Sequence, residues 1–563
     1  MSEFKFQSTV EPKKLAELYA ISGEEWGAPF TAEQYGKNEA NYLVKWILSG
    51  KAGRGFYLQS KSGVLVCSAV VTQHKGFYKE ADRGGITNVP DPAAFGVKPA
   101  TGLRLEHVFT HKDYRGKGLM KRLLLKVIEY TEDEIIKKEL AKSSENKDSL
   151  KLMVTTGGTV DKTLVNHYLG KKYFWYLYSA IGEGYKPYGF KTYPADGYVV
   201  PFSLQNTYSY KLVEQALQSE ASHVDVGKKI RFLNGTNKLD RDLIEYIFQG
   251  MELDLMTDLS KGNFHSELSG GQRSSSSLTN IASALSQTKL GSTNELSAIA
   301  EKLEESTLGA TSGVEHATVA GKRLLGESLR RKLSVHSFGV PRVGLKPELA
   351  NVEKYYKEEE EIAAKNGTPE NIHFSNLKGA ILTNELQQKS FYILWTTIMH
   401  KLFIILSMGE LKLDLFGALT DPSGFTNPLG RRRGSSFSGL NDMGGINFQD
   451  MALLVNTAVY VANHRTGLLP GANVTINDLP QNVPTSVLHD FFMNYLGKAE
   501  NEGELAEKGE IQDNEAAKGA QANVKYVKDF GDQLHILPCL KRFGNNSDNF
   551  EVDWTANSFT SWG

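Results

Sequence analysis

The sequence predicts an α/β protein, with strands and helices in its N-terminal part and a second α/β domain in its C-terminal part. Apolar and polar side chains alternate from Leu103 to Thr110, which is the period of an extended strand. After Gly118, apolar residues recur at helical spacing as far as Ile128, which is typical of an amphipathic helix. Strand-like apolar runs return between residues 391 and 406, where two buried strands, or a strand and a helix, are predicted in the second domain.

Residues 1–203 are predicted to form the first domain. Helices are expected within 11–48, because Pro12 suits a first helical turn and apolar residues follow it at helical spacing. The Gly- and Pro-rich stretch 75–102 is expected to be a loop that covers a substrate cleft. Three further strands are predicted in this domain, at 56–58, 64–71 and 150–155.

The rest of the chain divides into three predicted parts. Residues 204–256 form a connecting segment, and 257–345 form a Ser/Thr-rich low-complexity insertion that is expected to be disordered. Residues 346–563 form the C-terminal α/β domain, interrupted by loops at 421–447 and 497–523. Its predicted elements are strands at 391–395, 402–406 and 535–540 and a buried helix at 451–462.

The composition excludes several classes of protein. Lys plus Arg (64) nearly equals Asp plus Glu (65), so no global charge favours nucleic acid or a membrane surface. The two cysteines, Cys67 and Cys539, permit neither a disulfide framework nor a Cys-x-x-Cys metal site. The N-terminal residues contain no apolar signal core, and polar residues interrupt the longest apolar region, 391–408. A soluble cytoplasmic protein without a bound metal is the expectation.

The turn Arg115-Gly-Lys-Gly118 lies between the predicted strand and the predicted helix. The first backbone N–H groups of a helix have no intrahelical acceptor, and the helix dipole makes that end positive. Glycines let a phosphate approach the backbone closely, because they carry no Cβ atom. Two cations and two glycines at a helix start therefore predict a phosphate-binding turn.

Two motifs in this sequence resemble those of the GNAT N-acetyltransferase superfamily. Arg115, Gly118 and Met120 fall on the defined positions of its acetyl-CoA motif, Gln/Arg-x-x-Gly-x-Gly/Ala, and Met120 departs from the usual small residue. Tyr185 and Gly189-Phe190 match a second motif, Tyr-x-x-x-Gly-Phe, in the expected chain order. The wording Leu-Tyr-Ser-x-Ile-Gly before that tyrosine is similar to the fungal lysine N6-acetyltransferase branch. The resemblance covers roughly residues 1–200.

The resemblance implies a GNAT fold for the first domain, which is a mixed central sheet flanked by helices, and acetyl-CoA as cosubstrate. The backbone of the strand before the turn would hold the pantetheine arm, and the turn itself would hold the pyrophosphate. The implied cofactor-binding residues are Val108, Phe109, Thr110, Arg115, Gly116, Lys117, Gly118, Leu119 and Met120. The C-terminal domain would be family-specific and would help to complete the amine site.

The resemblance also implies the catalytic groups. A lysine ε-amine has a pKa of about 10.4, so a base must remove a proton before it attacks. Glu106 lies on the strand and is the candidate base, on the face that alternation shares with Val108 and Thr110; the alternative is an ion pair with Arg104 or another cation. Tyr185 matches the position of the acid that protonates the departing thiolate, and its alternative role is aromatic packing on the cofactor.

The expected function is therefore acetyl transfer from acetyl-CoA to a primary amine, by direct attack in a ternary complex. The best candidate for the amine is the ε-amino group of L-lysine, as in lysine degradation. Two alternatives remain open: a protein or polyamine N-acetyltransferase, and a non-catalytic acyl-CoA-binding regulatory protein. The sequence contains no serine-hydrolase, zinc-protease or dinucleotide motif that would support another chemistry.

Overall fold

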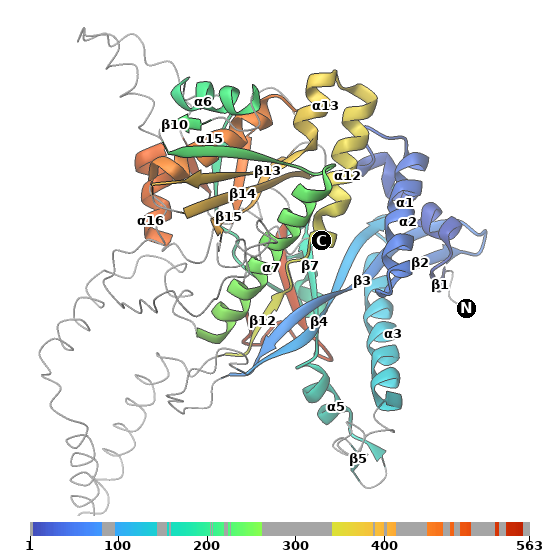
Figure 1. Ribbon diagram of the computed structural model, residues 1–563. Helices are drawn as coiled ribbons and strands as arrows, with labels where there is room; N and C mark the ends of the chain where they lie inside the picture. Colours follow the sequence, from blue (N-terminus) through green and yellow to red (C-terminus); the bar gives the residue numbers. More distant parts are fainter. Residues whose placement is uncertain are drawn as a thin grey trace, which may run out of the picture. The chain divides into compact units, whose positions relative to one another are not determined.

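The computed structural model shows two sheets with helices packed on them (Figure 1). The described residues of Met1–Glu80, Val89–Ser260 and Pro341–Gly563 belong to one compact unit. The structure describes residues 4–81, 96–142, 155–156, 159–202, 204, 207–218, 223–225, 227–261, 340–386, 389–398, 402–411, 448–465, 473–477, 485–496, 524–527, 536–545 and 547–555.

The first sheet contains nine strands among the described residues. Its main path runs β1-β2-β3-β4-β7-β18-β8; neighbours are antiparallel except β4 and β7, which are parallel. Two short strands extend it, since β12 pairs with β3 and with β19. The strands are β1 (Phe4–Thr9), β2 (Gly53–Ser60), β3 (Leu65–Lys79), β4 (Val97–Thr110), β7 (Tyr173–Ser179), β8 (Lys191–Thr192), β12 (Arg342–Leu345), β18 (Leu537–Arg542) and β19 (Asp553–Trp554).

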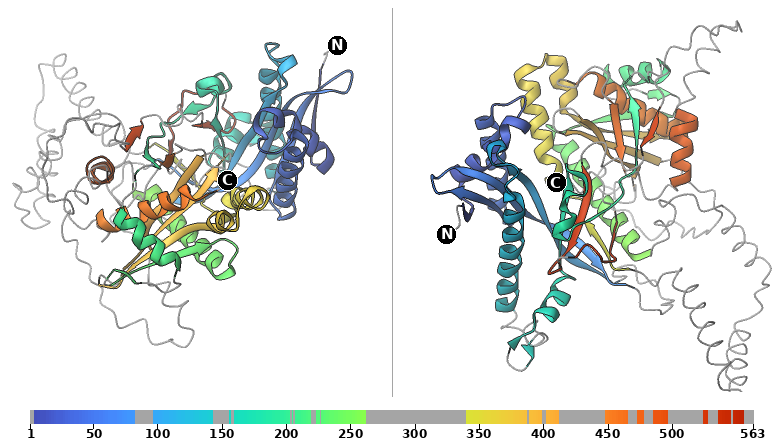
Figure 2. Two further views of the ribbon diagram at one scale, coloured as in Figure 1. Left: turned by 90° about the horizontal axis from the view of Figure 1, so that it is seen from above. Right: turned by 180° about the vertical axis from the view of Figure 1, so that it is seen from behind.

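Helices cover both faces of this sheet (Figure 2). On one face, α1 (Pro12–Trp26) and α2 (Ala32–Leu48) pack on Tyr57 and Val70. On the other, α3 (Leu119–Lys142) buries its apolar stripe against side chains such as Leu105. The helices begin where local chemistry favours it: Pro12 occupies the first turn of α1, and the Thr31 hydroxyl accepts a hydrogen bond from the Gln34 N–H at 3.2 Å. The 3₁₀ segment η1 (Lys112–Tyr114) precedes α3, and β5 (Thr155–Thr156), β6 (Thr159–Val160) and α5 (Lys162–Leu169) follow it. A second 3₁₀ segment, η2 (Gly182–Tyr188), follows β7.

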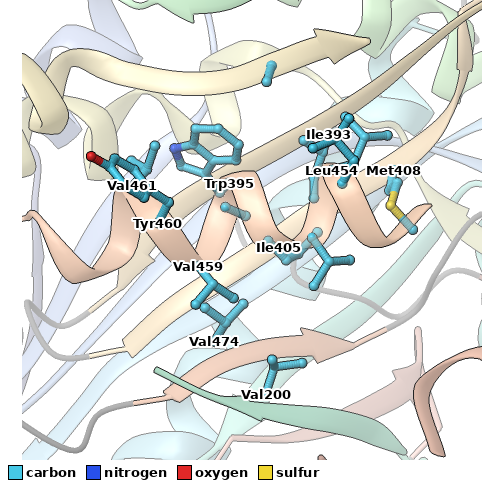
Figure 3. Close-up of a cluster of buried hydrophobic side chains, with 14 of the residues drawn as sticks. Val200, Ile393, Trp395, Ile405, Met408, Leu454, Val459, Tyr460, Val461 and Val474 are labelled. Carbon is cyan, nitrogen blue, oxygen red and sulfur yellow. The ribbon is translucent and has the colours of Figure 1, made fainter. Parts of the chain in front are cut away.

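The second sheet contains eight strands among the described residues, in the order β10-β11-β13-β14-β15-β16-β9-β17. Helix α15 (Phe448–Asn463) is buried on nearly all sides in the main core beside this sheet, together with Trp395, Ile405 and Val474 (Figure 3). The strands are β10 (His223–Asp225), β11 (Lys228–Asn234), β13 (Leu377–Asn384), β14 (Lys389–Ile398), β15 (Leu402–Leu411), β16 (Asn473–Asn477), β9 (Gly197–Pro201) and β17 (Lys525–Val527). The helices are α6 (Thr207–Gln218), α7 (Lys238–Lys261), α12 (Leu349–Asn366), α13 (Pro369–Asn376), α15 (Phe448–Asn463), α16 (Thr485–Asp490) and the π-helical Phe491–Leu496.

The two sheets repeat one topology. In the first, antiparallel β1 to β4 are followed by parallel β7; in the second, antiparallel β11, β13, β14 and β15 are followed by parallel β16. The last strand of each repeat lies in the other sheet. Strand β9 follows β8 in the chain but lies between β16 and β17, whereas β18 follows β17 in the chain but lies between β7 and β8. The chain thus exchanges equivalent strands between its two halves.

Most predicted elements are present. Helices α1 and α2 occupy 11–48, the strand–turn–helix is β4 and α3, and the predicted late strands and buried helix correspond to β14, β15, β18 and α15. The prediction of a loop over 75–102 is wrong at both ends of that range, because β3 continues to Lys79, β4 begins at Val97, and the two strands pair as far as these residues. The predicted Ser-rich insertion is narrower than 257–345, since α7 reaches Lys261 and Arg342–Leu345 form β12.

Several predicted segments lie outside the described residues. They are the interior of the Ser-rich insertion, the loops 421–447 and 497–523, and most of the strand expected at 150–155. None of the helices that the structure describes combines the length and the apolar character that a bilayer crossing requires.

Candidate functional site

Strands β4 and β7 separate along their length. They pair from Thr101 with Tyr173 to Arg104 with Tyr176 and no further, whereas β18 pairs with the other edge of β7 from Phe174 to Ser179. Residues 105–110 of β4 have no partner in β7. Their N–H and C=O groups on that side form an open strand edge, which suits an extended, amide-containing ligand. The predicted pantetheine-binding residues Val108, Phe109 and Thr110 lie in this segment.

A β-bulge interrupts β4 at the start of this open segment. Opposite β3, Glu106 pairs with Val70 and Phe109 with Ser68, so two residues of β4, His107 and Val108, oppose Ala69. The bulge changes the alternation: Glu106 and His107 both lie near Tyr19 of α1, whereas Val108 packs in the core beside α3. The expectation that Glu106 shares a face with Val108 and Thr110 is therefore wrong, because the extra residue reverses the order of faces.

The Gly-rich turn follows directly. Gly116 and Gly118 have φ values of 79° and 67°, a region that favours glycine, and a Cβ on either would meet nothing within 4 Å. Helix α3 begins at Leu119, so its first N–H groups face this open space. The side chains of Leu119 and Met120 pack into the core, so the bulk of Met120 is accommodated away from the turn.

Two cations flank the turn. The Arg115 guanidinium donates to the Thr110 carbonyl at 3.0 Å and pairs with Glu25 at 2.5 Å, with about half of its side chain exposed. The Lys117 ammonium lies 4.9 Å from the centre of the Tyr114 ring. The hydrogen bond from Arg115 to the Thr110 carbonyl ties the turn to the end of β4, so the open strand edge leads directly into the Gly-rich turn.

Tyr185 belongs to the buried cluster beneath the open edge. It lies in η2, is 8% exposed, and contacts the rings of Phe190 and Tyr188. Burial raises the pKa of its phenol, and the nearby thiols of Cys539 and Cys67 raise it further. The phenol is therefore protonated at neutral pH, as a proton donor must be. The Cys67 thiol lies 3.2 Å from the Thr110 hydroxyl, which connects this cluster to the strand edge.

Glu106 forms an ion pair with Arg104, which is the alternative role predicted for it from the sequence. Its carboxylate lies 3.5 Å from the Arg104 guanidinium and accepts a hydrogen bond from the Thr72 hydroxyl at 3.4 Å. Sequence reasoning missed the neighbours that share this face of the strand, which are Glu39 of α2 and Lys354 of α12. No spacing in the sequence connects positions so far apart, and only the tertiary fold brings them together.

The described residues contain no group of three His, Cys, Asp or Glu side chains that could hold a metal ion. Both cysteines are free and buried.

Residues 17–157 match the family model described as the acetyltransferase (GNAT) family. This segment contains the open strand edge, the bulge and the Gly-rich turn. The N-terminal part of the chain is therefore a GNAT N-acetyltransferase domain with a GNAT fold, a class of enzyme that uses acetyl-CoA.

Other comparisons are more remote. A search of curated proteins finds no match. Among solved structures, the chain is similar to a tandem GNAT protein from the clavulanic acid biosynthesis pathway, at 8% identity and a TM-score of 0.34, covering 96% of this chain and 99% of that one. A GCN5-related N-acetyltransferase from Kribbella flavida is similar at 8% identity and a TM-score of 0.32, covering 95% of this chain and 71% of that one. The GNAT protein YhbS from Escherichia coli, in complex with CoA, is similar at 10% identity and a TM-score of 0.19, covering 34% of this chain and 71% of that one.

Gly118→Ala is expected to weaken acetyl-CoA binding about tenfold, because a left-handed alanine costs roughly 1–2 kcal/mol and the turn would move its N–H groups to relieve the strain. Gly50→Ala is the matched control, since Gly50 also has a positive φ (82°) and open space around its Cβ position. Calorimetric titration with acetyl-CoA should show weaker binding for the first variant alone, while both lose similar stability. Equal affinity in the two variants would refute the phosphate-binding role of the turn.

Proposed function

We propose that the protein transfers the acetyl group of acetyl-CoA to the ε-amino group of L-lysine, by direct attack in a ternary complex. The observation that carries the proposal is the continuity of the open β4 edge with the Gly-rich turn at the start of α3. An extended arm that ends in a diphosphate has that combination of chemistry: amides along the strand and anionic oxygens at a helix start.

In this proposal, the backbone of Val108, Phe109 and Thr110 holds the pantetheine arm, and the turn from Arg115 to Met120 holds the pyrophosphate. Acetyl-CoA supplies an acyl thioester when it is bound. Tyr185 provides the proton for the departing sulfur, which its buried, protonated phenol supports. Glu106 lies on the face of β4 toward α1 and is the proton acceptor that the resemblance suggests. No metal is required for these steps.

The motif before Tyr185, which resembles the lysine N6-acetyltransferase branch, supports a cationic amine as acceptor. A role in cytoplasmic lysine degradation belongs to the same proposal, and a protein or polyamine substrate is the second candidate.

Release of free thiol from acetyl-CoA tests the proposal. The purified protein is expected to release thiol with L-lysine and to form N6-acetyl-lysine, detected by mass spectrometry. Tyr185→Phe should bind acetyl-CoA as the wild type does but turn over at least tenfold more slowly, because the sulfur then leaves without its proton donor. Release with polyamines or a lysine-rich peptide alone would exclude lysine as the substrate. Acetyl-CoA binding without release for any amine would favour the non-catalytic, regulatory alternative.

A further inference from the structure

We propose that His107, held by the buried carboxylate of Glu39, is the group that takes the proton from the attacking amine, in place of Glu106. This inference rests on the proposed function, since it assigns the base of that reaction. It also assigns a role to the second half of the chain, because Lys354 of α12 fixes the Glu39 carboxylate.

The backbone of His107 is the first observation. Its φ is 49°, and among the described residues it is the one non-glycine residue with a positive φ. Such a conformation costs about 1–3 kcal/mol and persists where surrounding contacts enforce it. The residue stands at the bulge in the open segment of β4, three residues after Arg104, which is the last residue of β4 that pairs with β7. The strained position therefore adjoins the segment proposed to hold the acetyl-bearing arm.

The contacts of the ring are the second observation. His107 Nε2 lies 3.3 Å from Glu39 Oε2, and Nδ1 lies 3.5 Å from the Tyr35 hydroxyl. The ring also stands perpendicular to that of Tyr19, with centroids 4.6 Å apart. Since a carboxylate only accepts hydrogen bonds, Nε2 carries the hydrogen that faces Glu39. Nδ1 is then the basic nitrogen, and it faces the Tyr35 hydroxyl.

Glu39 is suited to orient this ring. It is 5% exposed and lies 2.7 Å from the ammonium of Lys354. Burial alone would raise the pKa of its carboxyl, but the ammonium of Lys354 and the hydrogen bond with His107 outweigh burial and lower that pKa to about 2. Glu39 is therefore ionised at neutral pH, where it fixes the tautomer of His107 and stabilises the imidazolium that proton transfer forms. It is a positioning residue, and Lys354 positions it in turn.

Glu106 is less suited to be the base. Its two oxygens are already engaged by the Arg104 guanidinium and the Thr72 hydroxyl. The groups that face His107 from the packed elements are Tyr19 of α1, Tyr35 and Glu39 of α2, and Glu106 of β4, with Lys354 and Glu358 of α12 around Glu39.

At neutral pH the substrate amine is an ammonium group. One of its protons passes to the Tyr35 oxygen as Tyr35 gives its own proton to Nδ1 of His107, and the imidazolium then loses that proton to solvent. The freed nitrogen lone pair forms a C–N bond to the thioester carbonyl carbon, the C–S bond breaks, and the sulfur takes a proton from Tyr185. The acetylated nitrogen loses one further proton to solvent and Tyr185 regains one, so the products are the amide, the free thiol and one proton.

His107→Asn is the main test, because asparagine tolerates a positive φ and the variant should fold. Its kcat with lysine is expected to fall at least a hundredfold at pH 7, with a much smaller change in KM. The deficit should shrink as the pH rises toward about 10, where the free amine needs no base. His167→Asn, which removes an exposed histidine of α5, is the matched control and should behave as the wild type.

Three further variants separate the roles. Glu106→Gln should lower kcat less than His107→Asn at pH 7, and Glu39→Gln should lower kcat and shift the ionisation seen in its pH profile. Glu358→Gln shows how much of the pH dependence of kcat comes from Glu358, because burial beside Glu39 raises the pKa of its carboxyl to about 8, within the pH range measured. A loss in His107→Asn that is the same at every pH would overturn the proposal, as would a larger, pH-dependent loss in Glu106→Gln.

A measurement without acetyl-CoA keeps this inference separate from the proposed function. Nitrogen-15 NMR of the histidine rings, with His107 assigned by its loss in His107→Asn, should show the tautomer protonated at Nε2, and Glu39→Gln should change it. Protonation at Nδ1 in the wild type would overturn the proposal even if lysine is acetylated. Conversely, the expected tautomer with no thiol release for any amine would refute the proposed function and with it the base assignment.

Discussion

The fragments 1–261 and 341–563 are expected to fold only together. Expressed alone, each should be insoluble or unfolded, because each lacks an interior strand of its sheet. The first fragment lacks β18, which pairs with β7 along Leu537–Arg542 and with β8 on its other side. The second lacks β9, which lies between β16 and β17. Coexpression, with an affinity tag on one fragment only, should yield a soluble complex of both that binds acetyl-CoA.

The expected loss of folding is large because the exchanged strands contribute buried core residues. Cys539 and Leu540 of β18 and Val200 of β9 are fully buried, and each strand closes a core that would otherwise face water. A protease site inserted between 262 and 340 of the intact chain is the matched control, since the cut fragments should stay together after cleavage. If fragment 1–261 alone were folded and bound acetyl-CoA with full affinity, the exchange would have no importance for stability.

Glu359→Gln is expected to destabilise the protein by about 3–5 kcal/mol. The Glu359 carboxylate on α12 lies 2.7 Å from Lys378 and 2.8 Å from Arg465, and both cations are buried. Thr396 donates a further hydrogen bond at 3.2 Å, and the Thr397 N–H also donates to it. A neutral amide would remove the nearest countercharge from both buried cations and leave Lys378 with the more distant Glu360, at 3.8 Å. Urea unfolding followed by circular dichroism measures the loss.

Glu353→Gln on the same helix is the control. Glu353 pairs with Arg241 at 2.7 Å and Lys357 at 3.0 Å, but its side chain is 30% exposed, so the loss should stay below about 1 kcal/mol. Burial alone would raise the pKa of Glu359, but Arg465 and Lys378 lower it overall. The stabilisation is therefore present above the pKa of an unfolded glutamate, about 4.3, and is lost as the pH falls through the lower folded value. A Glu359→Gln penalty that stays constant on acidification would contradict this account.

The sequence by itself determined the strand, turn and helix from Leu103 to Ile128, because each depends on local properties. Side-chain period sets the strand and the amphipathic helix, and the backbone freedom of Gly116 and Gly118 sets the turn. The short motifs around Arg115 and Tyr185 indicated the superfamily for the same reason, since they are contiguous in the chain. Buried helix α15 was also predictable from its apolar composition.

The tertiary structure decided what depends on distant residues. The bulge at His107 could not be read from alternation, because it arises from the register between β3 and β4. Exchange of β9 and β18 is invisible in the sequence, since either strand would satisfy the same hydrogen bonds in its own half. The meeting of Glu39, His107 and Lys354 requires α2, β4 and α12 to pack together. Local sequence fixes which elements form, whereas long-range packing fixes which side chains share a site.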